Sequence, residues 1–510
     1  MDQHLGAGEE PTNDEISRHR NLLTDVNVNV DKTTWERLWP VIACGAGLFF
    51  DGYLNGVIGS VSTMLSAIYS KEYVDSSAQS NVAAIAFVGQ VVGQLFFGWT
   101  SDHWSRKWSL FISTLIVIFF AILCTASYGA GGSPYGLFAA LTAYRFFLGI
   151  GVGGEYPAGS VACAESTGEL KAGRRHTWFI LFTNVQIDLG FVVAAIVPMI
   201  LVLITGEHRA GLMIAWRVSL GLGIIPPLSL LYLRFKLKEP ESFRRGTMAR
   251  THTPWLLCIK YYWFRLVVVA TIWFLYDFSA YSYGLLSSQL LTNLLGSDSK
   301  LWVSFGWNTL LTFFYMPGCI LGSFLSDWVG PRNALGYSVL LQGIIGFILA
   351  GVYSYAAQPQ YIAGFVVIYG VFIALGELGS GDNIGLIAFK TCATAVRGKY
   401  YGIVAAAGKT GAFVGSKTLI LLYNHYYKAG ETAKAGAYPF YISSSLCMLS
   451  AALALFCLPR IGQDTIEEED AKFKAYLERN GYDVSKMGLN PLAGDGGVAG
   501  RGTVERAKAG

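Results

Sequence analysis

Charged residues interrupt the long apolar stretches of this sequence and are the first candidates for a functional site. A charge within such a stretch is costly unless a partner or a function compensates for it. Buried carboxyl groups favour their neutral form and can exchange protons, whereas a buried lysine attracts anions. The residues concerned are Asp51, Arg145, Glu155, Asp188, Asp277, Glu377, Asp382, Lys409 and Lys417.

One set of polar side chains has helical spacing. Trp273, Asp277 and Tyr281 are four residues apart, which puts an indole, a carboxylate and a phenol on one helix face over two turns. One such face can line one cavity. Lys409 is the cation placed deeply enough to attract an anion into it. Uncharged groups suited to phosphate or polyol oxygens occur in other apolar stretches, at Tyr156, Gln186 and Asn383.

Other chemistries find little support. The seven histidines lie in tails and loops without recurring ligand spacing, so we expect no metal site. The glycine-rich run at 149–157 lies in an apolar stretch with no preceding strand, which favours helix packing over nucleotide binding. A net charge of +4 without a basic stripe argues against nucleic acid. No catalytic constellation is recognisable, so we expect neither an enzyme nor a cofactor.

The elements that must position these residues are membrane-spanning helices. Of the 510 residues, 53% are hydrophobic and 14% are charged, against about a quarter charged in soluble domains. The composition therefore predicts an all-α integral membrane protein in a lipid bilayer. Twelve spans are predicted, near residues 38–64, 80–101, 107–129, 136–165, 176–204, 213–236, 263–293, 301–326, 333–355, 360–389, 397–424 and 437–459.

The distribution of charge predicts orientation and domain organisation. An even number of spans puts both tails on one side, and lysine and arginine collect in the loops of that side, so both termini are expected in the cytoplasm. Residues 464–479 predict a charged helix outside the membrane. The longest polar interruption divides the body, which gives a tail 1–37, a six-helix half 38–236, a central loop 237–262, a second half 263–459 and a tail 460–510.

Two pairs of features share nearly one offset, which indicates an internal duplication. Asp102 in GWTSDHWSRK and Asp327 in SFLSDWVGPR lie 225 positions apart, and Asp51 and Asp277 lie 226 positions apart. Basic residues follow the first pair, so we predict a conformational switch in which each aspartate pairs with a nearby cation. The predicted members of this switch are Gly98, Asp102, Arg106, Lys107, Asp327 and Arg332.

The duplication and the Gly-x-x-x-Asp loop resemble the major facilitator superfamily. GVGGEYP at 151–157, AGKTGA at 407–412 and the Trp273 triplet are similar to the fungal phosphate:proton symporter branch. The resemblance implies alternating access between two six-helix halves. It also implies that Asp51, Glu155 and Lys409 lie close to a phosphoryl site lined by Tyr156, Gln186, Trp273, Asp277, Tyr281 and Asn383.

Departures from that branch bear on the substrate. Leu54 replaces its second aspartate of the first span, Asp382 replaces the proline before Asn383, and 389–398 lacks its Pro-Gly-Glu sequence. These changes put inorganic phosphate in doubt. The segments 155–191 and 376–391 are instead similar to the fungal glycerophosphodiester permeases, which carry glycerophosphoinositol or glycerophosphocholine.

This resemblance implies a proton-coupled importer, expected in the plasma membrane. A phosphodiester arrives as a fixed monoanion, so a protein carboxylate must carry the coupling proton, and the candidates are Asp51, Glu155 and Asp277. Secondary candidates are Arg145, Asp188, Glu377 and Asp382. The three acids can accept hydrogen bonds from inositol or glycerol hydroxyls, or can surround a choline ammonium together with Trp273 and Tyr281. They can also serve as structural partners.

Three alternatives remain open at this point: an inorganic phosphate:proton symporter, a sugar or organic-acid porter, and a nutrient sensor that binds but scarcely transports. The sequence selects neither the headgroup of the diester nor the number of coupled protons. It does not indicate an oligomeric state.

Overall fold

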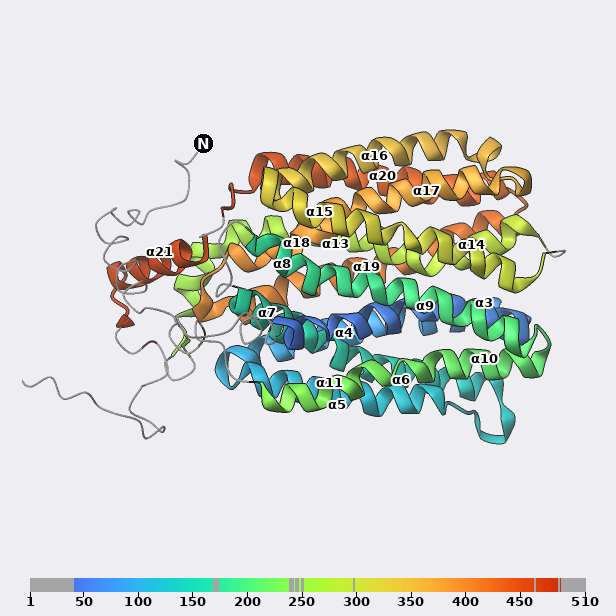
Figure 1. The fold of residues 1–510 in the computed structure, drawn as a ribbon, viewed down its shortest axis with the longest axis horizontal. Helices are drawn as coiled ribbons and strands as arrows, with labels where there is room; N and C mark the ends of the chain where they lie inside the picture. Colours follow the sequence, from blue (N-terminus) through green and yellow to red (C-terminus); the bar gives the residue numbers. More distant parts are fainter. Residues whose placement is uncertain are drawn as a thin grey trace, which may run out of the picture.

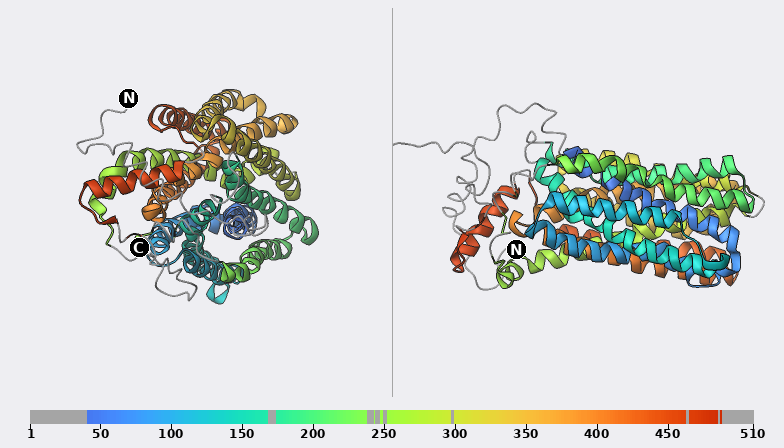
Figure 2. Two further views of the ribbon diagram at one scale, coloured as in Figure 1. Left: turned by 60° about the vertical axis from the view of Figure 1, so that its left-hand side comes forward. Right: turned by 90° about the horizontal axis from the view of Figure 1, so that it is seen from below.

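The computed structural model describes residues 41–167, 174–237, 243, 247–248, 252–296, 299–462, 465–484 and 487. These residues form helices that run side by side along the long axis of the molecule (Figure 1), around a common centre (Figure 2). No strand occurs among them. The predicted tail 1–37, parts of the central loop and the chain end beyond 487 lie outside the described residues.

The first half of the bundle occupies the lower part of Figure 1 and contains the first six spans. The fifth and sixth spans are built from two helical segments each, and the fourth from three. The helices are α3 (Leu48–Val74), α4 (Ala78–His103), α5 (Arg106–Thr125), α6 (Pro134–Gly154) with η2 (Glu155–Ser160) and α7 (Val161–Thr167), α8 (Arg175–Phe182) with α9 (Asn184–Thr205), and α10 (Arg209–Leu222) with α11 (Ile225–Lys236).

The second half repeats this pattern and ends with a helix that lies beyond one end of the bundle (Figure 1). That last helix, α21, confirms the charged helix predicted near 464–479. The helices are α13 (Trp255–Leu295), α14 (Leu301–Phe313) with α15 (Tyr315–Val329), α16 (Pro331–Ala356), α17 (Ile362–Gly376) with η4 (Glu377–Gly381) and α18 (Asp382–Lys390), α19 (Arg397–Lys428), α20 (Thr432–Cys457) and α21 (Thr465–Arg479).

The twelve predicted spans are all present. Eleven helical segments of the described chain are long and apolar enough to cross a membrane. The twelfth span is α19, whose 32 residues include Lys409 and Lys417, and these lysines lower its hydropathy. Two boundaries differ most from the prediction: α3 continues to Val74 and does not end near 64, and α13 begins at Trp255 and not near 263. Its added turns carry Tyr261 and Tyr262, which pack against Phe473 of α21.

Both halves contain a π-helical turn in their fourth span. In the first half it is η2, where Pro157 lacks the N–H that an α-helical hydrogen bond needs. In the second half it is η4, which begins at Glu377 and contains two glycines. Such turns occur mostly at functional sites because they re-aim side chains within a helix. Here each turn begins with a buried glutamate, Glu155 in the first half and Glu377 in the second.

Candidate functional site

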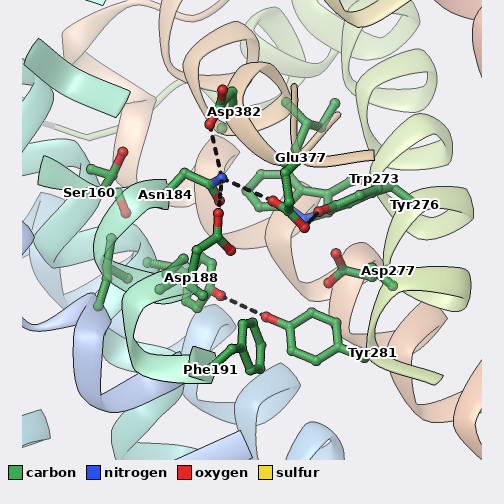
Figure 3. A pocket seen from close by; sticks show the side chains of 18 of the residues that line it. Ser160, Asn184, Asp188, Phe191, Trp273, Tyr276, Asp277, Tyr281, Glu377 and Asp382 are labelled. Atoms are coloured by element: carbon green, nitrogen blue, oxygen red, sulfur yellow. Dashed lines mark hydrogen bonds between the residues drawn. The ribbon is translucent and has the colours of Figure 1, made fainter. Parts of the chain in front are cut away.

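A cavity of about 60 Å³ lies between the two halves, midway along the bundle. Its walls come from α3, η2, α8, α9, α13, α15, η4, α18 and α19, so both halves contribute. Figure 3 shows its polar groups converging from these helices. The polar residues of the wall include Asn55, Tyr156, Asn184, Asp188, Trp273, Tyr276, Asp277, Tyr281, Tyr315, Glu377, Asp382 and Lys409.

The only cation in the cavity wall, as far as the described residues go, is Lys409. Its ammonium lies 3.1 Å from Oδ2 of Asp277, and both side chains are at most 2% exposed. The same ammonium stands 3.7 Å from the ring centroid of Tyr281 and 4.9 Å from that of Tyr156. This close packing depends on Gly408, because a Cβ there would lie 2.4 Å from the Trp273 ring. The predicted association of Lys409 with the α13 triplet is therefore observed.

Asp51 lies behind this wall, fully buried, and is linked to it by hydroxyl groups. The Tyr156 hydroxyl donates to Asp51 Oδ2 at 2.5 Å and lies 3.3 Å from the Tyr281 hydroxyl. Asn55 donates to Asp51 Oδ1 at 2.6 Å. A chain of polar groups thus runs from Asp51 through two phenols to the ring that faces Lys409.

A second group of carboxyls occupies another part of the same cavity (Figure 3). We call Asp188, Glu377 and Asp382 the acidic cluster. The side-chain amide of Asn184 lies 3.3 Å from Asp188 Oδ2, 3.0 Å from Glu377 Oε2 and 3.0 Å from Asp382 Oδ1. The Tyr276 hydroxyl donates to Glu377 Oε1 at 2.6 Å. The cluster joins α9, η4 and α18 across the two halves.

Sequence reasoning missed Asn184 and Tyr276. Asn184 lies four residues before Asp188, a spacing that places both on one helix face and could have indicated the contact. Tyr276 precedes Asp277, so adjacent residues of α13 reach the acidic cluster and Lys409 respectively. No pattern in the sequence distinguishes that tyrosine from the many others.

Glu155, a predicted proton carrier, does not line the cavity. Its two carboxylate oxygens accept hydrogen bonds from the two terminal nitrogens of Arg234, each at 2.5 Å, and Ser113 donates a further bond at 3.2 Å. Both charged side chains are fully buried. The η2 turn aims Glu155 at α5 and α11, and this bidentate pair favours a structural role within the first half.

Two further predicted lining residues also point away from the cavity. Gln186 donates to the carbonyl of Leu181 at 3.3 Å. Asn383 accepts from the Ser326 hydroxyl at 2.6 Å and donates to the Gly379 carbonyl at 2.8 Å. The α18 helix turns by about 100° per residue, so it presents Asp382 to the cavity and not the neighbouring Asn383.

The remaining charges inside the spans tie helices together. Arg145, 1% exposed, donates to the Val82 carbonyl at 2.8 Å, which joins α6 to α4. Lys417 donates to Asn81 Oδ1 at 2.9 Å, a contact between the two halves. These geometries assign structural roles to both residues.

The halves meet again at the end of the bundle nearer α21. Asp102 accepts hydrogen bonds from the backbone N–H groups of Gly398 and Lys399, at 2.9 and 2.8 Å, and so caps the start of α19. Gly98 allows the approach, since a Cβ there would lie 2.8 Å from the Gly398 carbonyl oxygen. The mirror contact in the repeat joins Asp327 to the backbone N–H of Thr177 at 3.1 Å.

A network of buried charges supports this contact. Arg106 lies 3.6 Å from Asp102 Oδ1 and 2.8 Å from Glu165 Oε1. Arg397 of α19 lies 3.4 Å from the same Glu165 oxygen, which connects the halves.

Two predicted members of the switch lie elsewhere. Lys107 stands over the rings of Trp108 and Phe235, at 5.3 and 5.4 Å. Arg332 donates to the Leu455 carbonyl. Both therefore face away from the aspartate that each was predicted to serve.

The two halves also contact each other on the side of the cavity away from α21. The hydroxyls of Thr63 and Ser288 are 3.1 Å apart, and Gln79 donates to Gln289 at 3.2 Å. Each pair joins one half to the other. The cavity is thus flanked by inter-half contacts on both sides.

Comparisons with known proteins agree with this architecture. Residues 39–244 and 240–473 match the model of the "Sugar (and other) transporter" family. A glycerophosphocholine permease of Candida albicans is 44% identical over 483 residues, which cover 94% of this chain and 88% of that protein. The major glycerophosphoinositol permease of the same organism is 44% identical over 491 residues, covering 96% and 89%.

The fold has solved counterparts. The proton:xylose symporter XylE, a major facilitator superfamily protein from E. coli, superposes with a TM-score of 0.70. The match covers 86% of this chain and 99% of that one at 16% identity, so it bears on the fold alone.

Proposed function

The chain belongs to the sugar (and other) transporter family of the major facilitator superfamily, and we propose that this member imports glycerophosphodiesters together with protons. Membership makes it an integral membrane transporter and not an enzyme. The observation that carries the proposal is the Lys409–Asp277 ion pair, buried in a cavity between two halves.

The ion pair supplies a way to couple an anion to a proton. A phosphodiester is a monoanion, and its phosphoryl oxygens compete with Asp277 for the Lys409 ammonium. Once displaced, a buried carboxylate without a cation is strongly disfavoured, so Asp277 takes up a proton. Substrate binding and protonation then favour each other, as linkage requires. Asp51, which the Tyr156 hydroxyl holds behind the wall, is a second place for that proton.

The contacts on either side of the cavity provide for alternating access. A cavity of about 60 Å³ accommodates only a few water molecules, at about 10–15 Å³ each, so a diester must widen it. Separating the Gln79–Gln289 side opens the cavity one way, and releasing Asp102 from α19 opens it the other way. The excess of lysine and arginine in the loops on the α21 side supports a cytoplasmic location for that end and for both termini. An importer of external substrate is consistent with the plasma membrane.

Similarity favours a diester over the alternatives. Permeases of glycerophosphocholine and glycerophosphoinositol are 44% identical to nearly the whole chain. The acidic cluster in the cavity wall adds a physical reason, because three carboxyls disfavour the second charge of inorganic phosphate near neutral pH. A neutral sugar carries no charge that a buried lysine could bind.

The test is uptake by proteoliposomes that contain the purified protein, with an acidic outside. Labelled glycerophosphoinositol and glycerophosphocholine are offered in turn, with unlabelled phosphate, inositol and the other diester as competitors. Concentrative uptake that collapses with a protonophore supports the proposal. Inhibition by phosphate alone would overturn the diester assignment, and binding without flux would favour a sensor.

A further inference from the structure

The charges of the cavity wall do not balance. Among the described residues that line the cavity, four are acids and one is a base. Lys409 is engaged by Asp277 at 3.1 Å. The acidic cluster of Asp188, Glu377 and Asp382 is left without a cation, although all three side chains are at most 4% exposed.

Hydrogen-bond donors are also too few for the cluster. The Asn184 amide has two hydrogens, yet three carboxylate oxygens lie within 3.3 Å of its nitrogen. Tyr276 contributes one more donor, to Glu377, and the Cys319 thiol a weak one, to Asp188. Asp382, 2% exposed, lines the cavity. Its Oδ2 packs against Gly322 of α15 and has no hydrogen-bond partner in the described structure. As carboxylates, the three side chains therefore lack both a cation and a full set of hydrogen-bond donors.

Aromatic rings border the same region. Phe191 lies beside Asp188 in Figure 3, and its ring centroid is 5.6 Å from that of Tyr315 and 5.9 Å from that of Tyr281. Tyr276 adds a further ring. Carboxylates combined with aromatic walls attract a quaternary ammonium, which binds through charge and ring faces and needs no directed ligands. No set of described side chains has the arrangement that would hold a metal ion.

The basic and acidic regions adjoin. Asp277 faces Lys409, and its chain neighbour Tyr276 bonds to Glu377. A ligand whose phosphate displaces Asp277 therefore extends its alcohol toward the acidic cluster.

We propose that the acidic cluster is a subsite for a cationic headgroup, so that the protein prefers a glycerophosphodiester with a quaternary ammonium to one with a neutral polyol. The inference rests on the proposed function above and assigns its specificity. Glycerophosphocholine has this chemistry and glycerophosphoinositol does not. The competing arrangement is a protonated cluster that donates hydrogen bonds to polyol hydroxyls, and it predicts the reverse preference.

The experiment compares KM for glycerophosphocholine and glycerophosphoinositol in proteoliposomes containing wild type, Glu377→Gln or Asp382→Asn. Loss of one charged contact should raise KM for the choline diester about tenfold to a hundredfold more than KM for the inositol diester. Glu431→Gln is the matched control, since Glu431 forms an exposed pair with Lys434 at 2.9 Å far from the cavity. In Glu431→Gln the ratio of the two KM values should be the same as in the wild type.

The outcomes separate the two proposals. If the wild type transports neither diester, the proposed function itself is refuted. Transport with an inositol preference, or equal KM changes for both diesters in the variants, refutes the subsite alone. A variant that fails to fold loses both activities and its thermal transition, so choline chloride as a competitor of wild-type uptake gives a second measurement. Inhibition by choline, but not by inositol, supports the subsite, and the reverse overturns it.

Discussion

Replacing Asp277 with asparagine should separate substrate binding from proton coupling. Asparagine has nearly the volume of aspartate but cannot release or accept the coupling proton. In the wild type, the carboxylate 3.1 Å from Lys409 must be displaced before the phosphate can reach the ammonium. In Asp277→Asn the ammonium has no competing carboxylate. We therefore expect the variant to bind the diester more tightly and to lose concentrative uptake.

The two effects can be sized. Displacing a hydrogen bond between charged groups costs about 1.5–3 kcal/mol, so Kd should fall about tenfold to a hundredfold in the variant. For one coupled proton, an inward gradient of two pH units supplies about 2.7 kcal/mol, and the wild type should accumulate substrate about a hundredfold from this term. The variant should only equilibrate it. Wild-type affinity should also weaken as pH rises, because anion binding requires a protonated Asp277, and the variant should lack this dependence.

Binding is measured by calorimetry on purified protein from pH 5 to 8, and coupling by uptake and counterflow in proteoliposomes. Counterflow should persist in Asp277→Asn while gradient-driven accumulation disappears. Asp277→Glu is the control, since it keeps a titratable group near Lys409 and should retain some accumulation. If Asp277→Asn still concentrates substrate in proportion to the pH gradient, Asp277 does not carry the proton and the reasoning fails. Weaker binding at every pH would instead indicate a purely structural pair.

Three further changes test the architecture. Glu155→Gln leaves the buried Arg234 without its carboxylate, which costs about 3–5 kcal/mol, so the thermal transition should fall sharply; an unchanged transition would contradict the structural role. Asp102→Asn weakens the cap on α19. Engineered cysteines lining the cavity should then react faster than in the wild type with a reagent supplied from the α21 side. Equal rates in variant and wild type would argue against a gate there. A Cβ at position 402 would lie 2.5 Å from the Gln94 carbonyl oxygen. Gly402→Val should therefore block closure on that side and reduce transport while substrate still binds. Normal turnover would show that this contact does not form in the transport cycle.

The fold could be predicted because each span is long and because most charged residues lie outside the spans. Apolar runs of about 20 residues have few alternatives in a chain this poor in charge. The nearly equal offsets of Asp102 from Asp327 and of Asp51 from Asp277 indicate the duplication. The twelve spans are confirmed, eleven by length and hydropathy and the twelfth as α19. The start of α13 was harder to place, because its first turns are stabilised by packing on α21, a contact distant in sequence.

The site was predictable where helical spacing alone decides which side chains share a face. Trp273, Asp277 and Tyr281 line one cavity with Lys409, as their spacing indicated. Orientation within a helix that contains a π turn cannot be deduced in this way, since the extra residue rotates everything after it. That is why Asp382, and not Asn383, reaches the cavity, and why the partner of Glu155 was not foreseen.

The glutamates that begin the two π turns have different partners, and this difference makes the cavity wall asymmetric. Glu155 and Glu377 each begin the π turn in the fourth span of their own half. In the first half, the sixth span supplies Arg234, so Glu155 is neutralised within its own half. In the second half, the corresponding helix α20 has a single basic residue, Lys434, in its first turn and none beyond it. Within the described part of the chain Glu377 has no arginine partner, and its carboxyl faces the cavity, where it can contact a substrate.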